Sequence, residues 1–165
     1  MRSNTDDAPK PGWATRVGHS VLRALGLSAS GSDREEIREC IYRYGWGFDE
    51  RDVERLRDCF TSDAVWIGNI MGIDTVGPYA GRDEIMAFLS DFWTVQTDQR
   101  RHFFTNIIFD DVAATRASAQ AYFLLTAASS ATMTPMTTGP YRFEMMKHDG
   151  AWRIQRLLAG FDAPF

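Results

Sequence analysis

The 165-residue sequence has few cysteines and shows no spacing of side chains typical of a metal site. Its two cysteines, Cys40 and Cys59, form no CxxC motif and no Cys/His ligand pattern. A disulfide framework and a zinc site are therefore not expected, and the sequence fits a reducing cytoplasm. We expect the protein to work with no metal and no cofactor.

The sequence also lacks basic excess and long apolar runs. Its 18 Lys and Arg residues face 22 Asp and Glu residues, which gives a formal net charge of −4. Without a basic field, nucleic acid is not an expected partner. No apolar run approaches the ~20 residues that span a bilayer. Charged residues interrupt the segment 13–27, which excludes a signal peptide, so we expect a soluble, cytoplasmic protein with no membrane partner.

Apolar residues are present in sufficient number, at 44% with 13% aromatics, to build the core of one domain. Residues 1–31 are interpreted as an N-terminal extension, with a disordered tail followed by a short amphipathic helix at 13–25. A linker and a helix-start signature around Ser32 and Asp33 then begin the main domain, 32–165.

The main domain carries helical patterns before most of its strand patterns. An apolar stripe made of Ile37, Ile41, Tyr44 and Phe48 predicts an amphipathic helix that ends near Asp49. Two shorter helices are predicted from residues 53 and 83. Strands are predicted in AVWIG, RHFFTNIIF, ATRASAQAYFLLT, YRFEMM and WRIQRLL. This order is typical of an α+β fold in which a curved antiparallel sheet wraps a long helix.

Two segments are predicted as loops. The first is GIDTVGPYAG, and the second is AASSATMTPMTTGP, which is expected to be a mobile cover or a dimer-contact arm at the pocket.

The strand at 102–109 has two apolar faces. Alternation places His102, Phe104, Asn106 and Ile108 on one face and the intervening residues on the other. One face would line a pocket, and the other needs a cover. A second copy of the chain would supply that cover, so we expect a homodimer.

Three polar residues are the candidates for chemistry. Asp49 follows Tyr44 by five residues, about 140° further round an ideal helix, and Gly45 and Gly47 leave room for a close approach. His102 lies within a strongly patterned strand. The alternative interpretation is structural: Asp49 caps the helix end, Tyr44 belongs to the core and His102 is an ordinary strand histidine.

Four segments in order resemble the SnoaL-like branch of the NTF2-like superfamily, over about residues 33–158. They are YGWGFDERDVERLRDCFTSDAVW, GRDEIMAFL, RRHFFTNIIFDD and KHDGAWRIQRL. The resemblance implies a cone-shaped barrel, in which a curved antiparallel sheet wraps a long helix beside two further helices. Two of the segments are similar to scytalone dehydratase, and Tyr44, Asp49 and His102 are similar to a set in bile-acid 7α-dehydratase.

The resemblance implies a cofactor-independent dehydratase or other lyase, in which Asp49, His102 and Tyr44 act on a small apolar polycyclic or polyketide-like substrate. The sequence departs from scytalone dehydratase where that enzyme has a second catalytic histidine, since Ser129 stands there, and again around Gly139 and Tyr141. Scytalone is therefore not the expected substrate. A ketosteroid isomerase would need an aspartate near Gly68, and the polar set of limonene epoxide hydrolase is also missing.

Two further classes of function stay open. The same pocket could serve a cyclase or isomerase of secondary metabolism, or the chain could be non-catalytic, as a small-ligand binding module or a structural subunit resembling the β subunit of aromatic-ring dioxygenases. Aromatic and polar candidates for contact with a small-molecule substrate complete the prediction. They are Trp46, Trp66, Phe88, Phe92, Trp93, Phe104, Asn106, Tyr122 and Tyr141.

Overall fold

The computed structural model describes residues 31–165. The predicted helix at 13–25, and the extension that contains it, lie outside the described residues. Three helices and six strands follow one another along the described chain. They are α1 (Gly31–Asp49), α2 (Val53–Asp58), β1 (Phe60–Ile70), β2 (Asp74–Ala80), α3 (Arg82–Val95), β3 (Gln99–Val112), β4 (Arg116–Ser129), β5 (Thr132–His148) and β6 (Ala151–Phe161).

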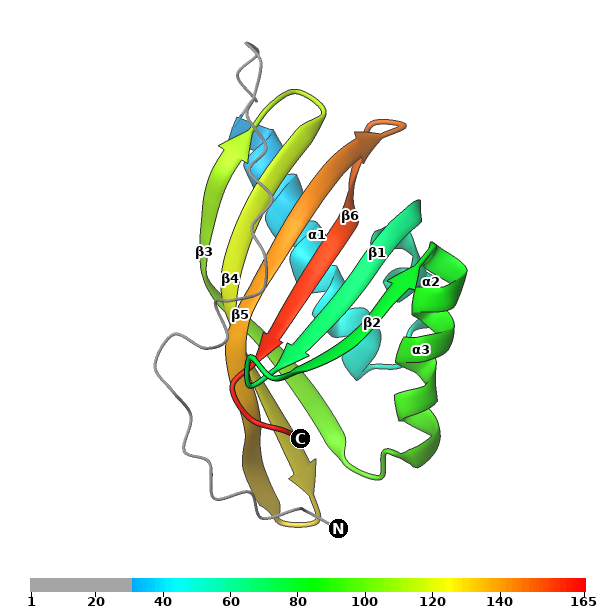
Figure 1. Cartoon of the computed structure of the whole chain (residues 1–165), viewed down its shortest axis with the longest axis vertical. Coiled ribbons are helices and arrows are strands. Elements are labelled where there is room, and N and C mark those ends of the chain that lie inside the picture. The colour runs from blue at the N-terminus through cyan, green and yellow to red at the C-terminus, as the bar shows by residue number, and fades with distance from the viewer. Residues whose placement is uncertain (1–30) are drawn as a thin grey trace.

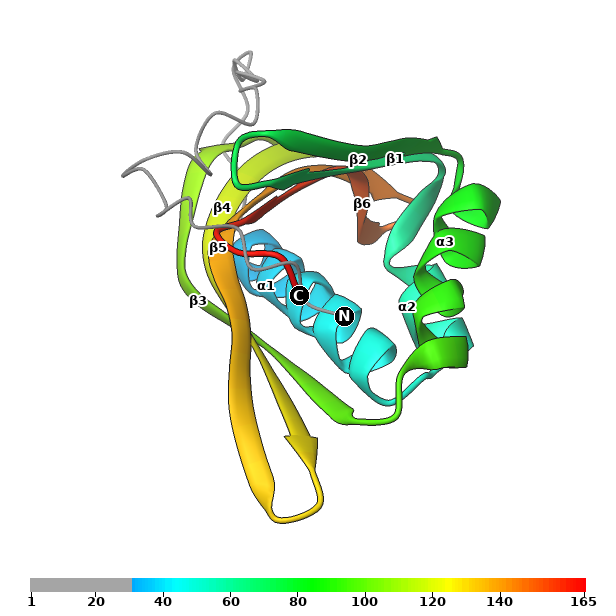
Figure 2. The same cartoon turned by 60° about the horizontal axis from the view of Figure 1, so that its bottom comes forward.

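The six strands form one curved sheet in the order β2-β1-β6-β5-β4-β3. Figures 1 and 2 show α1 lying along the hollow side of this sheet, with α2 and α3 across the gap between its two ends. The predicted α+β class and the curved sheet around a long helix are confirmed. The sheet stays open, with β2 and β3 as its edges. It is also not wholly antiparallel, because β1 and β6 pair in parallel, which their long separation in the chain permits.

The apolar stripe of α1 is buried against the sheet, as its period predicts. Ile37 and Ile41 are fully buried. At the start of the helix, the carboxylate of Asp33 accepts hydrogen bonds from Lys147 Nζ on β5 (2.8 Å) and from Trp152 Nε1 on β6 (2.9 Å). These bonds satisfy the N–H of a buried tryptophan and tie the first turn of α1 to the sheet.

The contact between α1 and α2 depends on Gly47. A Cβ at this position would lie 2.8 Å from the backbone nitrogen of Leu56. Because a backbone atom cannot turn aside as a flexible side chain can, we expect Gly47→Ala to lower the free energy of unfolding by about 1–3 kcal/mol, despite the better helix propensity of alanine. Chemical denaturation measures this, with the exposed Glu39→Ala on the same helix as control. An unchanged midpoint would show that α2 shifts freely.

Both segments predicted as loops are strands, which corrects the sequence interpretation. Residues 74–80 form β2, which pairs with β1. The segment 127–140 continues β4 and β5 as a hairpin, in which Ser129 pairs with Thr132 across a two-residue turn, and Figure 2 shows the hairpin projecting beyond the rest of the sheet. Its threonines are β-branched and suit an extended backbone. The predicted loop is therefore wrong, whereas a role of this hairpin as a cover of the pocket or a dimer-contact arm stays a prediction.

The alternation predicted along 102–109 holds only at its start. Asn106 has a positive φ of 53°, and the pairing with β4 shifts between Thr105 and Ile108. This bulge reverses the faces, so that Ile107 and Phe109 pack on the core while Asn106 and Ile108 are exposed.

The outer surface of β3 and β4 exposes several large apolar side chains, among them Phe103, Tyr122 and Leu124. Apolar patches of this kind are typical of contact surfaces. The homodimer stays a prediction, and light scattering that showed a monomer at micromolar concentration would contradict it.

No helix within residues 31–165 is long and apolar enough to cross a bilayer.

Candidate active site

A cavity of about 270 Å³ lies between α1, α3 and the inner face of the sheet. Its walls are mostly aliphatic and aromatic, and only a few polar groups reach it. The lining residues come from every strand, from α1 and α3, and from the segment that follows β6. They are Tyr44, Phe48, Trp66, Ile70, Val76, Phe88, Leu89, Phe92, Arg100, His102, Leu125, Tyr141, Phe161 and Phe165.

Asp49 and His102 form a buried pair at one wall of this cavity. Asp49 Oδ1 lies 2.6 Å from His102 Nδ1, and Asp49 Oδ2 accepts a hydrogen bond of 2.7 Å from the backbone N–H of His102. Their side chains are only 5% and 8% exposed. Both carboxylate oxygens are thus occupied by one residue, which fixes the carboxylate relative to the imidazole ring.

The pair depends on the position of β3 at the edge of the sheet. An edge strand leaves alternate N–H groups without a partner strand, and the carboxylate of Asp49 satisfies the one at His102. Gln99 Nε2 also donates to the backbone carbonyl of Asp49 at 3.0 Å. Gly45 allows this close approach, because a Cβ there would lie 3.2 Å from His102 Cβ. The end of α1 is therefore docked directly onto β3.

The hydrogen bond to Asp49 selects the tautomer of His102. A carboxylate only accepts, so Nδ1 carries the proton and Nε2 keeps a lone pair. No residue among 31–165 hydrogen-bonds to Nε2. A neutral imidazole in this state can accept a proton from a molecule in the cavity, and the carboxylate stabilises the imidazolium that forms.

Tyr44 stands beside the pair with its hydroxyl in a hydrogen-bonded group. Trp66 Nε1 donates to the Tyr44 hydroxyl at 3.4 Å. Burial raises the pKa of Tyr44 above its ordinary value, and hydrogen bonds from Trp66 and Tyr141 only partly oppose the rise. Burial likewise raises the pKa of Tyr141, with the nearby Tyr44 adding to it. Both phenols therefore stay protonated. Because Trp66 and Tyr141 both donate to the Tyr44 oxygen, the Tyr44 O–H is the one that can donate a hydrogen bond into the cavity.

These raised pKa values predict how stability depends on alkaline pH. The folded state favours the protonated phenols of Tyr44 and Tyr141, so their contribution to stability is complete below the ordinary tyrosine pKa of 10.0 and is lost as pH rises above it. We expect two of the five tyrosines to ionise only when the protein unfolds. Phenolate absorbance and circular dichroism, followed together from pH 8 upward, measure this. Ionisation of all five in the folded protein would contradict it.

The structure places the predicted substrate-contact residues in three groups. Trp66, Phe88, Phe92 and Tyr141 line the cavity. Phe104 and Trp93 lie behind the cavity wall, where Phe104 packs on Tyr44 with ring centroids 6.1 Å apart and Trp93 packs on Phe48 at 5.8 Å. Neither lines the cavity.

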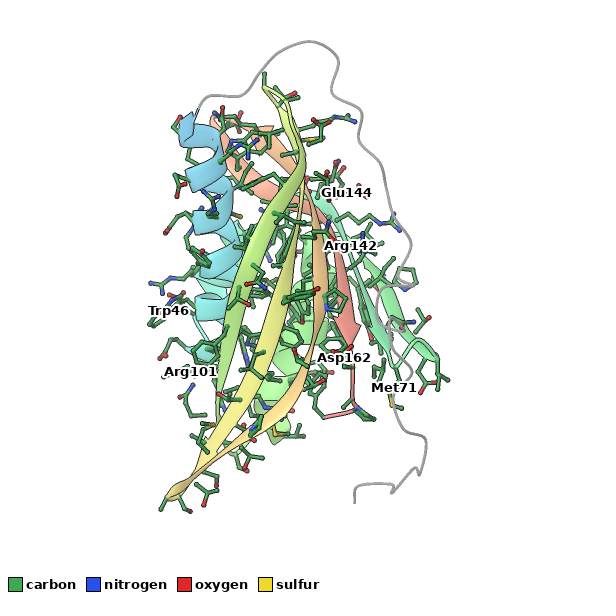
Figure 3. All side chains as sticks on the ribbon, turned by 90° about the vertical axis from the view of Figure 1, so that its left-hand side faces the viewer. Trp46, Met71, Arg101, Arg142, Glu144 and Asp162 are labelled. Carbon is green, nitrogen blue, oxygen red and sulfur yellow. The ribbon has the colours of Figure 1, made fainter. Side chains whose placement is uncertain are left out.

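The third group is a correction, because its members face solvent. Trp46 is 59% exposed and lies on the outer side of α1 (Figure 3). It follows Tyr44 by two residues, which turns it about 200° away round the helix. Tyr122 is 58% exposed, since it alternates with the buried Ala121 and Phe123 along β4. Asn106 is exposed at the bulge of β3.

Several cavity residues were not predicted. Arg100 could have been found, because it shares the face of His102 two residues earlier on the same strand. No signal in the sequence separates a cavity wall from ordinary core for the apolar lining residues Ile70, Val76, Leu125, Phe161 and Phe165.

Within residues 31–165, no group of three or more His, Cys, Asp or Glu side chains is placed to hold a metal ion.

Comparison with known proteins identifies the family and supports the fold. The model of the SnoaL-like domain matches residues 29–157. No curated protein matches the chain significantly. A solved structure from Catenulispora acidiphila, in complex with S-DNPA, shares 25% identity and a TM-score of 0.69, over 81% of this chain and 96% of that one.

Two further solved structures come from Novosphingobium aromaticivorans. An NTF2-like protein with a cystatin-like fold is 26% identical with a TM-score of 0.65, over 77% of this chain and 80% of that one. The β subunit of a putative aromatic-ring-hydroxylating dioxygenase is 15% identical with a TM-score of 0.67, over 81% and 92%. The first protein is described as NTF2-like, which agrees with the predicted superfamily. The second, at 15% identity, supports the fold alone. The chain belongs to the SnoaL-like domain family of the NTF2-like superfamily.

Proposed function

We propose that the protein is a cofactor-independent dehydratase that acts on a small, apolar, polycyclic or polyketide-like molecule by acid–base chemistry. The observation that carries the proposal is the Asp49–His102 pair, whose Nε2 is left for a ligand at the wall of an apolar cavity. A catalytic base needs this combination of a fixed tautomer and a water-poor site.

The proposed reaction starts with proton removal. His102 Nε2 takes the proton from the carbon next to a carbonyl, and Tyr44 donates a hydrogen bond to the oxygen as it becomes an enolate. The imidazolium, stabilised by Asp49, then returns the proton to the β-hydroxyl group. That hydroxyl leaves as water as the carbon–carbon double bond forms, so the histidine ends in its starting state.

A cyclase or isomerase would share the first step. Removal of the same proton gives an enolate that can attack a second carbonyl or be reprotonated elsewhere, and neither outcome releases water. The similar protein from Catenulispora acidiphila was solved in complex with S-DNPA, which supports a ligand-binding role for this fold. A purely structural subunit, in contrast, has no use for a base that faces a cavity.

The test is incubation of the protein with a panel of polycyclic β-hydroxyketones in D₂O, followed by mass spectrometry. Dehydration should yield a product lighter by one water. Isomerisation should incorporate deuterium at carbon without loss of water. Cyclisation without dehydration should yield an isomer of the same mass that separates by chromatography, because the deprotonated carbon then forms a bond to carbon and takes up no deuterium. If compounds of the panel bind but none of them is dehydrated, isomerised or cyclised, the result would contradict a catalytic function and favour a binding module.

A further inference from the structure

Among the described residues 31–165, Arg100 is the one permanently charged side chain in the wall of the cavity. It lies on β3 two residues before His102, and strand alternation places both on the same face. Two residues of extended chain separate them by about 6.6 Å along the strand. The side chain is only 15% exposed. Burial of a positive charge beside apolar walls is unfavourable unless the charge is paired, so a bound anion would stabilise Arg100 in this position.

The contacts of Arg100 leave part of its guanidinium unoccupied. Its Nε donates to Asp98 Oδ1 at 3.1 Å, and its Cζ lies 5.8 Å from the centre of the Phe165 ring. Asp98 offsets the charge but engages only this one nitrogen. Within residues 31–165, no hydrogen bond or ion pair joins either Nη group to another residue. Two parallel N–H donors of this kind match the two oxygens of a carboxylate.

We propose that Arg100 is a specificity-determining residue that binds a carboxylate group of the substrate. The carboxylate would lie about one fused two-ring system away from the carbon that His102 deprotonates, so the substrate class is a polycyclic aromatic or polyketide-like acid. The assignment of the reacting carbon rests on the proposed function, whereas the carboxylate site itself rests on the cavity and on Arg100 alone. A bicyclic acid is compatible with a volume of about 270 Å³.

Arg101 provides a matched control. It is the next residue on β3, so its side chain points to the opposite face, and Figure 3 shows it at the outer surface on the α1 side. Its Nη1 pairs with Glu50 Oε1 at 2.8 Å, and both side chains are 42% exposed. Loss of this exposed ion pair should leave the cavity unchanged.

The experiment compares the binding of 2-naphthoate and 2-naphthamide to the full chain at pH 7, by isothermal titration calorimetry. The two probes share a ring system and differ in charge. Charge-assisted hydrogen bonds predict that the unmodified protein prefers the acid by about 10- to 100-fold. Arg100→Gln should abolish this preference while binding of the amide changes little, Arg100→Lys should keep part of it, and Arg101→Gln should keep all of it.

Equal binding of the two probes, or no binding of either, would overturn the proposal on the unmodified protein, whether or not the variants fold. An acid preference that survives in Arg100→Gln would overturn it as well. Measuring the preference in His102→Ala separates the two proposals. If His102→Ala keeps the preference for the acid, the carboxylate site is supported. If the same variant also keeps its turnover, only the proposed acid–base reaction is contradicted.

Discussion

His102→Ala and Asp49→Asn should each lower turnover by about 10²–10⁴-fold, and the double variant should be scarcely slower than either single variant. His102 is the proposed base, and it depends on Asp49 for its tautomer, its orientation and the stabilisation of its charged form. Groups that act as one unit are not additive, because removing either one removes most of what both provide. Steady-state kinetics on a substrate identified from the panel would measure this.

The control for Asp49→Asn is Glu50→Gln. The two positions are adjacent carboxylates at the end of α1, but Glu50 is half-exposed and pairs with Arg101 on the outer surface. Turnover of Glu50→Gln should stay close to that of the unmodified protein. Unfolding midpoints, recorded for every variant, separate a loss of catalysis from a loss of fold. Single variants that keep their activity but lose stability would show that Asp49 and His102 are structural.

Tyr44→Phe should lower kcat by about 10²–10³-fold with little change in KM. The phenol is proposed to donate a hydrogen bond to an oxygen that gains negative charge only as the proton leaves, so its effect is concentrated in the transition state. The substitution also leaves the N–H of Trp66 without its acceptor, at an expected cost of about 1–3 kcal/mol of stability. Kinetics and chemical denaturation measure the two effects separately.

Tyr42→Phe is the matched control, since Tyr42 lies on the same helix and is 41% exposed. It should change neither kcat nor stability appreciably. Equal losses of kcat in the two variants would indicate a general disturbance of α1. A rise in KM without a fall in kcat in Tyr44→Phe would assign Tyr44 to ground-state binding of the substrate.

Much of the fold follows from the hydrophobic period of the sequence. The stripe of α1 and the strands of the C-terminal half were predictable because burial on one face imposes a period on the residues. The hairpin at 127–140 was missed because its small side chains and threonines have little hydrophobic contrast, so strand and loop look alike. Its residues pair as strands through backbone hydrogen bonds, which leave a weak trace in composition.

The candidate site was predictable only in part, and for a geometric reason. Asp49 does not share the narrow buried stripe of α1, yet it reaches His102 because the last turn of the helix is docked against the edge strand. That docking is a tertiary arrangement with no local signature. Trp46 shows the opposite case, since helical geometry alone places it on the outer side of α1. Asn106 was misplaced because a β-bulge shifts the alternation on which its assignment depended.

The hydrogen bond from the backbone N–H of His102 to the Asp49 carboxylate allows the site to be followed through a main-chain amide. An amide proton bound to a carboxylate resonates according to the charge on that carboxylate. The His102 amide is therefore an internal reporter in NMR spectra, because its chemical shift should respond to occupation of the neighbouring cavity without any label placed inside the site. The same hydrogen bond should also slow the exchange of this amide with solvent, which sets it apart on an edge strand, where alternate amides have no partner strand.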